Sequence, residues 1–427
     1  MIRIRAEEHS KYAFLICALC GEILKDDLRG ALGGERLARR TVQKAREDRL
    51  ITERKTPLGK IIRLTKNGYD ELSKIPPLKL HYDVLTKHHT FSQDKTTLQR
   101  RRAMARTILT FTESETPVSG ISLFFDNRPG RKKAPAGVND TVLNPVFGKE
   151  LFTGLDHVFV TYESSRDFFT EPVVSFSEHA ARIASLNAGF FPSNIVKRHF
   201  GSERSTAGNM NSTRSKGQLF GGETSYAVYY MDKAPQDTPA QNELRYAEYI
   251  LDVYEKLYGA AALRRLTAGS RKGKAIIIGG ELSALPSFVM DEKDRLMKNS
   301  VSAKNVLPSI YSEIHFFAFG RKNPSWIIKP GWEEDLLRQY YLPAERNRAE
   351  HAGAGRHIKA VVDRKGIKML SMPLFTPDIV RIGDSISEIL LMGEHLHILC
   401  PREYEQQISK IYEPYEKAHI ELIEMEE

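Results

Sequence analysis

The pattern of apolar and polar residues is most regular between residues 35 and 48. At 100° per residue, one side of a helix over Glu35–Asp48 carries small or apolar side chains: Leu37, Ala38, Thr41, Val42 and Ala45. The opposite side carries Arg36, Arg39, Arg40, Gln43, Lys44 and Glu47. The pattern therefore predicts a helix that packs on its neighbours with one face and presents a basic face outwards.

Shorter elements are expected on both sides of this basic helix. They are helical segments over Ser10–Cys20 and Leu24–Leu32, and strands over Ile51–Arg54 and Ile61–Leu64. The pair Gly33-Gly34 separates the second helical segment from the basic helix, and the turn Thr56-Pro57-Leu58-Gly59 joins the two strands. The order helix, helix, basic helix, two-stranded hairpin and exit helix is typical of a winged helix-turn-helix.

A winged helix-turn-helix predicts contact with double-stranded DNA. Its third helix enters the major groove, where side chains reach base edges, and its hairpin meets the phosphate backbone. The residues expected to contact DNA are Arg36, Arg39, Arg40, Gln43, Lys44, Arg54, Lys55 and Lys60. The alternative is that this helix face is charged only because it is solvated.

The distribution of charge supports the first interpretation. The chain has 427 residues and a net charge of +9. Residues 1–75 hold 17 Lys and Arg against 11 Asp and Glu, so +6 of this net charge lies in the first sixth of the chain. Such asymmetry is typical of a head that binds a polyanion. The apolar run Tyr12–Cys20 is too short to span a bilayer and has no signal-peptide cleavage site, so we expect a cytoplasmic protein without membrane contact.

Three domains or segments follow from the changes in pattern. We expect a DNA-binding domain over 1–76, a linker with a basic helix over 77–118, and a mixed α/β body over 119–427, with a division into two lobes near 267–274 as an option. In the second segment, a helix over Thr96–Phe111 carries Arg100, Arg101, Arg102 and Arg106. This second basic patch either extends the DNA footprint or is a solvated face.

The body alternates strand-like and helix-like segments, which indicates an α+β or mixed α/β fold. The expected strands are Ile121–Phe125, His157–Tyr162, Tyr226–Met231, Lys274–Ile278, Ile314–Phe319, Ile358–Val362, Ile379–Ile382, Glu388–Met392 and His395–Leu399. The expected helices are Glu178–Asn187, Gln241–Leu257, Glu333–Tyr341 and Glu403–Ile423. The stretch 201–222 is rich in Gly, Ser and Asn, which predicts a long loop.

A catalytic interpretation rests on His395-Leu396-His397. Period-two geometry places both imidazoles on one face of a strand, where two histidines can hold a divalent metal against a phosphate. Tyr404 and Tyr412 follow, and a tyrosine hydroxyl can attack that phosphate. The arrangement resembles the histidine-hydrophobe-histidine motif of rolling-circle replication initiators and relaxases. The competing interpretation, which we prefer, is a structural strand with two half-exposed histidines.

The remaining motifs favour neither metal nor cofactor binding. The pair Cys17-x-x-Cys20 has the spacing of half a zinc site, but no second Cys/His pair follows at finger-like spacing. Both cysteines lie in an expected core helix, where buried thiols are common. Asp363-x-Lys365 has no acidic partner at the spacing of a restriction-type nuclease. We therefore expect no metal and no cofactor.

A further resemblance concerns the middle of the chain. The segment Thr213-Arg214-Ser215-Lys216-Gly217, the strand Tyr226–Tyr230 and the helix with Glu243 and Glu248 resemble a pattern in replication-relaxation proteins of Gram-positive mobile elements. Those proteins also carry a winged-helix head. The resemblance covers roughly residues 10–75 and 205–260, and it implies DNA binding in a plasmid or conjugative element, without any catalytic assignment.

Three functions are consistent with these observations. The preferred one is a non-catalytic, site-specific DNA-binding protein of a mobile element, acting as a homodimer in replication, maintenance or transfer, with replication or transfer proteins as partners. The second is a winged-helix transcription regulator whose α/β body senses a small ligand. The third is an enzyme that nicks DNA with a His-x-His metal site and a C-terminal tyrosine.

Overall fold

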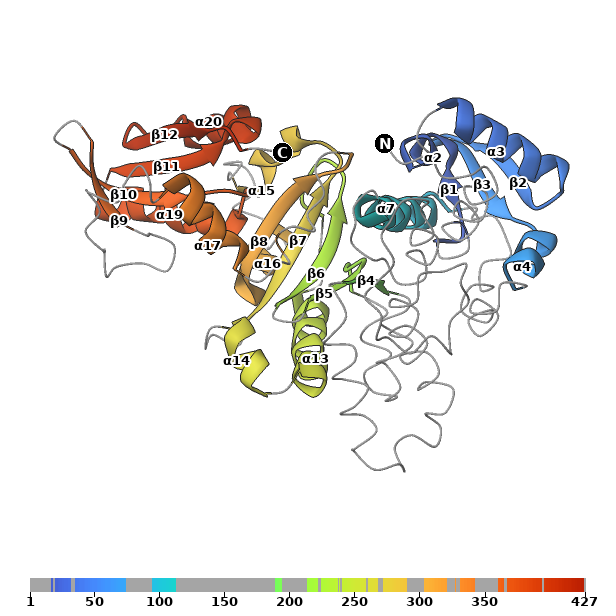
Figure 1. Ribbon diagram of the computed structural model, residues 1–427, viewed down its shortest axis with the longest axis horizontal. Coiled ribbons are helices and arrows are strands. Elements are labelled where there is room, and N and C mark those ends of the chain that lie inside the picture. The colour runs from blue at the N-terminus through green and yellow to red at the C-terminus, as the bar shows by residue number, and fades with distance from the viewer. Residues whose placement is uncertain are drawn as a thin grey trace, which may run out of the picture. The chain divides into compact units, whose positions relative to one another are not determined.

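Helices and strands alternate along the computed structural model, as expected for a mixed α/β fold (Figure 1). It describes residues 17, 20–31, 35–73, 94–112, 189–193, 213–221, 224–236, 238, 240–258, 260–267, 272–289, 303–320, 327, 331–341, 360–364, 367–393 and 395–425. These residues divide into two compact units. The first draws on the ranges 1–211, 215–222 and 252–263, and the second on 212–214, 223–251 and 264–427. Each is described by itself.

The first unit begins with residues 17–73, which we call the head. Its elements are β1 (Ile23–Leu24), α2 (Lys25–Ala31), α3 (Glu35–Glu47), β2 (Ile51–Thr56), β3 (Gly59–Leu64) and α4 (Lys66–Ser73). The strands form an antiparallel sheet in the order β1-β3-β2. The expected basic helix thus ends one residue early. The preceding helix starts at Lys25 because Ile23 and Leu24 pair with β3 instead.

The apolar face of α3 packs into the head as its periodicity predicts. Ala38, Thr41, Val42 and Ala45 are each less than 5% exposed. Buried residues from the other elements complete this core: Cys17, Cys20, Ile23, Leu28, Ile51, Ile61, Ile62, Leu64 and Tyr69. Cys17 and Cys20 are the described residues of the expected helix over Ser10–Cys20, and both are helical.

Helix α7 (Lys95–Thr112) belongs with the head, although the sequence places it in a linker segment. Asp94 caps its start by accepting from the backbone N–H groups of Thr96 and Thr97. Leu98 then packs with Leu24 and Ile61 in a small apolar cluster. The helix also contacts α2 and β4, so this segment contributes a packed element rather than a free connection.

In the first unit, strands β4 (Gly189–Pro192) and β5 (Gly217–Gly221) pair antiparallel. In the second unit, β6 (Thr224–Met231), β7 (Gly273–Gly279) and β8 (Tyr311–Ala318) are neighbours in that order. The last three are parallel. They read as nearly continuous apolar runs because both faces are covered. Strand β5 lies within the stretch that was expected to be a loop, so that expectation is wrong for Gly217–Gly221.

Helical connections join these parallel strands. Between β6 and β7 run α13 (Ala240–Tyr258) and α14 (Ala260–Thr267), and between β7 and β8 run a 3-10 turn (Leu282–Ala284), α15 (Pro286–Val289) and α16 (Ala303–Ile310). Helix α13 confirms the expected helix over Gln241–Leu257. Among the helices that the structure describes, none offers an apolar stretch of the length that a bilayer crossing needs.

A second sheet, in the C-terminal part, has the order β12-β11-β10-β9 (Figure 1). Its strands are β9 (Ala360–Arg364), β10 (Ile367–Pro373), β11 (Leu396–Pro401) and β12 (Ala418–Ile423). Strands β10, β11 and β12 are parallel, and β9 pairs antiparallel with β10. The helical elements here are α17 (Trp332–Leu336), a π-helical turn (Leu337–Tyr341), α19 (Ile379–Met392), a 3-10 turn (Arg402–Tyr404) and α20 (Glu405–Tyr412).

Two expectations for this region are wrong. The strands expected over Ile379–Ile382 and Glu388–Met392 are the two ends of the single helix α19, which Asp378 caps. The helix expected over Glu403–Ile423 ends at Tyr412 and is followed by strand β12. The expected elements Ile121–Phe125, His157–Tyr162 and Glu178–Asn187 lie outside the described residues.

Candidate nucleic-acid interface

The exposed face of α3 carries the residues that the sequence assigns to the major groove. Arg36, Arg39, Arg40, Gln43 and Lys44 are all exposed, and we call them the α3 basic face. None of the four cations forms an ion pair with another described residue. The Gln43 amide donates to Glu47 at 2.9 Å, which holds this side chain along the helix. Uncompensated cations beside a polar side chain are suited to phosphates and base edges.

The basic residues of this face are spaced so that they repel one another, which destabilises the helix when no ligand is bound. Arg36 and Arg40 are four residues apart, and so are Arg40 and Lys44, while Arg39 lies three residues after Arg36. Like charges at these spacings are neighbours on the helix surface, and each pair at four residues destabilises a helix by about 0.2–0.5 kcal/mol. An anion bound along this face would relieve that repulsion.

Like charges are also neighbours at the end of the β2–β3 hairpin. Lys55 and Lys60 lie directly opposite each other in the strand register, and both are exposed. Like charges at directly opposed positions destabilise a sheet. Arg54 is half-buried and has its own interactions within the chain. The two lysines therefore form an exposed cationic tip on the hairpin. Arg54 is the least exposed of the eight residues that were expected to contact DNA.

The arginines of α7 behave differently from those of α3. Arg101 pairs with the buried Glu22 at 3.0 Å, and Arg106 pairs with the buried Asp27 at 3.1 Å. Arg102 lies 3.7 Å from the same aspartate. The interpretation of a merely solvated face is thus wrong for these three residues, because their charges hold α7 onto the head. Arg100 alone among the four is exposed.

The residues that carry the resemblance to replication-relaxation proteins meet around one carboxylate. Glu243 of α13 is fully buried. It accepts from the Thr213 hydroxyl at 2.7 Å and from the Arg214 backbone N–H. The Tyr229 hydroxyl of β6 also donates to it, at 2.7 Å, and lies 2.8 Å from the Tyr311 hydroxyl. Burial, together with the Glu243 charge, raises the pKa of both tyrosines well above the usual value.

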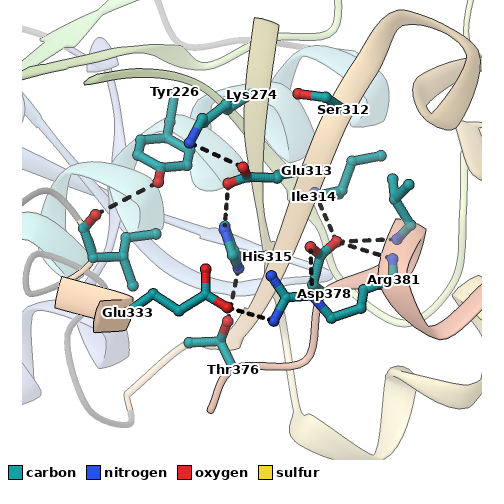
Figure 2. A network of polar contacts seen from close by, with 12 residues as sticks. Tyr226, Lys274, Ser312, Glu313, Ile314, His315, Glu333, Thr376, Asp378 and Arg381 are labelled. Atoms are coloured by element: carbon teal, nitrogen blue, oxygen red, sulfur yellow. Dashed lines mark hydrogen bonds and ion pairs between the residues drawn. The ribbon is translucent and has the colours of Figure 1, made fainter. Parts of the chain in front are cut away.

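A second buried network joins β7, β8, α17 and α19 (Figure 2). Lys274 pairs with Glu313 at 3.0 Å, and the other Glu313 oxygen lies 3.4 Å from His315 Nε2. The opposite nitrogen of His315 contacts the Thr376 hydroxyl at 2.7 Å. Burial alone would raise the pKa of Glu313, but His315 and Lys274 outweigh it and hold that pKa well below its usual range.

The same network continues into α19. Arg381 donates to Glu333 at 2.7 Å and to the Pro373 carbonyl at 2.8 Å. Asp378 accepts from the N–H of Ile314 in β8 at 3.1 Å and also caps α19. His315, Asp378 and Arg381 are all at least 93% buried. Because these charges are paired and enclosed, the network stabilises the packing of four elements and offers little surface to a ligand.

The expectation of two half-exposed histidines on one strand is wrong for His397, which lies in β11 and is buried, while the half-buried His395 directly precedes that strand. His395 Nδ1 lies 3.2 Å from His419 Nε2, and His397 Nε2 lies 2.9 Å from Glu421. His397 also contacts the Ser371 hydroxyl. Within the described part of the chain, no three His, Cys, Asp or Glu side chains are arranged to hold a metal ion. His395 is therefore held by His419, and His397 by Glu421 of β12 and Ser371 of β10.

The two tyrosines of the catalytic interpretation are buried. Tyr404 is 6% exposed and Tyr412 is 2% exposed. The Tyr412 hydroxyl lies 2.6 Å from the Ser385 hydroxyl, and burial raises the pKa of Tyr412 above its usual value. A nucleophilic tyrosine must reach its substrate and lose its proton readily. Tyr412 meets neither requirement, because its side chain is buried and its pKa is raised.

The cysteines are core residues as well. Cys17, Cys20 and Cys400 are free and no more than 3% exposed. Burial raises the pKa of each thiol, most clearly for Cys17 and Cys20. Such thiols are poor nucleophiles and poor metal ligands in the folded protein.

Sequence reasoning missed both buried networks and the role of the α7 arginines. A usable signal existed for one of them, because Glu313-x-His315 places two polar side chains on one face of an otherwise apolar strand. Comparison of the whole chain with protein-family models, with curated proteins and with solved structures finds no match. The residues and their geometry are therefore the basis for assigning a function.

Proposed function

We propose that this chain binds double-stranded DNA through a winged helix-turn-helix formed by the head, as a cytoplasmic, non-catalytic accessory protein of a mobile element. The observation that carries the proposal is the α3 basic face, whose cations have no carboxylate partner among the described residues. The antiparallel order β1-β3-β2 and the cationic hairpin tip also support it. In this arrangement α3 lies in the major groove and Lys55 and Lys60 contact the backbone.

Individual side chains then have distinct roles. Arg36, Arg39, Arg40 and Lys44 hold phosphates, which gives affinity that depends on salt but little on sequence. Gln43 is the side chain best suited to read a base, because an amide can bind adenine through two hydrogen bonds. Its internal bond to Glu47 is exposed and therefore exchanges readily for such contacts.

The salt dependence of binding tests this proposal. Binding of the whole protein to fluorescently labelled duplex DNA is measured by anisotropy at several salt concentrations. Replacing Arg39→Ala and Arg40→Ala together should lower the slope of log K against log salt by about two, since each lost phosphate contact removes about one. The matched control replaces Arg338→Ala and Lys410→Ala, two exposed cations of the second unit, and should leave the slope unchanged.

Two results would overturn the proposal. The first is an equal slope for the α3 variant and the wild-type protein, and the second is an equal loss in both double variants. Replacing Gln43→Ala should change the preferred sequence in a selection from random duplexes while leaving the salt slope unaltered. The mobile-element setting, which follows from the resemblance around Glu243, is tested by the neighbouring genes. A relaxase, coupling ATPase or partition gene beside this one would support it.

A further inference from the structure

Strand β12 is the outermost strand of the C-terminal sheet (Figure 1). Among the described residues, no strand pairs with its outer side. The N–H of Leu396 in β11 donates to the Lys417 carbonyl at 2.9 Å. In a parallel ladder this bond directs the N–H and C=O groups of His419 and Glu421 towards β11. The N–H and C=O groups of the alternate residues Ala418, Ile420 and Leu422 therefore point away from the sheet.

The outer side of β12 lacks three of the devices that protect an edge strand, although the strand carries one acidic residue, Glu421. Edge strands are commonly blocked by proline, by lysine within the strand or by a bulge. Ala418–Ile423 contains neither residue, and it pairs with β11 in unbroken register. All six of its residues are half-buried, so the described residues do not enclose this edge of the sheet. Such an edge is suited to adding another strand.

We propose that β12 pairs antiparallel with β12 of a second copy of this chain, about a two-fold axis at Ile420. The outward backbone groups then match: Ile420 faces its own counterpart, and Ala418 faces Leu422, each pair exchanging two hydrogen bonds. The side chains of these pairs are apolar and lie on one face of the combined sheet. The two four-stranded sheets become one continuous sheet of eight strands across the axis.

The pairing of side chains favours this register over its neighbours. With the axis at Ile420, His419 of each copy lies opposite Glu421 of the other, at the closer, non-hydrogen-bonded positions of the ladder. An axis at Glu421 would place two carboxylates opposite each other. An axis at His419 would place two imidazoles opposite each other and Glu421 opposite Lys417, whose ammonium already donates to the Gly393 carbonyl. Only the register about Ile420 places each histidine opposite an acid, and it does so twice because the interface is symmetric.

This dimer is independent of the proposed DNA binding, because it uses a different unit of the chain. It would, however, bring two heads into one particle, which is the arrangement that paired half-sites in DNA require. The oligomeric state is measured without DNA, so a failed dimer and a failed DNA interface give separate results.

The first test is the mass of the whole protein in solution, by light scattering after size exclusion. The wild type should have twice the mass of the 48.5 kDa chain at micromolar concentration and pH 7. Ile420→Pro removes an outward N–H while leaving the bonds to β11, so it should yield a folded monomer. Ile420→Val is the control and should remain a dimer. A monomeric wild type up to about 100 µM, or a dimeric Ile420→Pro, would overturn the proposal.

The second test reports the register and does not depend on proline being tolerated. Non-hydrogen-bonded partners lie about 4.5 Å apart at Cα, within reach of a disulfide. His419→Cys and Glu421→Cys should cross-link under mild oxidation only when the two variants are mixed, and neither should do so alone. The native cysteines do not interfere, because all three are buried. A cross-link in either variant alone, or none in the mixture, would contradict this register.

Discussion

The carboxylate of Glu243 should be among the most important single groups for the stability of the second unit. Glu243→Ala removes the acceptor of the Thr213 hydroxyl, the Tyr229 hydroxyl and the Arg214 N–H. The Thr213 hydroxyl and the part-buried Arg214 N–H lose this acceptor, and of the two hydroxyls of Tyr229 and Tyr311 only one can then donate to the other. Each such donor costs about 1–3 kcal/mol. We therefore expect the free energy of unfolding to fall by about 4 kcal/mol.

The matched control lies on the same helix. Glu248→Ala removes an identical, exposed side chain from α13 and should change the free energy of unfolding by no more than about 0.5 kcal/mol. Urea unfolding of both variants, followed by circular dichroism, measures the difference. A loss for Glu243→Ala no larger than that for Glu248→Ala would refute the reasoning, because it would mean that these buried donors need no charged acceptor.

Three further predictions concern Glu313 and Tyr412. Glu313 has a folded pKa below its unfolded value, so its contribution is present above about pH 4.3 and is lost as the pH falls through the folded value. The stability difference between wild type and Glu313→Gln should thus be largest at neutral pH and shrink below pH 4.3 in urea unfolding, whereas a constant difference would contradict this. Tyr412→Phe should cost about 1 kcal/mol, because Ser385 keeps a second acceptor in the Ile382 carbonyl. Supercoiled plasmid with Mg²⁺ should give no covalent adduct with either form, and an adduct lost in Tyr412→Phe would restore the nicking hypothesis.

The head could be anticipated closely because its signals are local. The apolar residues of α3 recur with the helical period over three turns, and a Pro-Leu-Gly turn joins the two strands of the hairpin. The short strand β1 could not be anticipated, since two residues carry no period and depend on a partner in β3. Glu22 and Asp27 pair with arginines about 80 residues later in the chain. These tertiary contacts leave no local pattern in the sequence from which they could be predicted.

The C-terminal part was harder because its local signals conflict. Ile379–Met392 contains two β-branched or apolar clusters that resemble strands when read separately. The cap residues Asp378 and Gly393 predict one helix between them, and this is the helix that the structure shows. In the same way, Pro414 disfavours the continuation of a helix, and α20 ends two residues before it, at Tyr412. The alternation within Ala418–Ile423 then has the period of a strand.

The contrast between the arginines of α3 and α7 is the strongest argument for the proposed interface. Both groups are rich in arginine, and both belong to the first unit. The carboxylates of Glu22 and Asp27 are already occupied by α7, and they are buried, so they cannot neutralise α3. The cations of α3 and the two lysines of the hairpin tip have no carboxylate partner among the described residues. This contrast is the reason for proposing a polyanion, rather than a carboxylate of the same chain, as the partner of this surface.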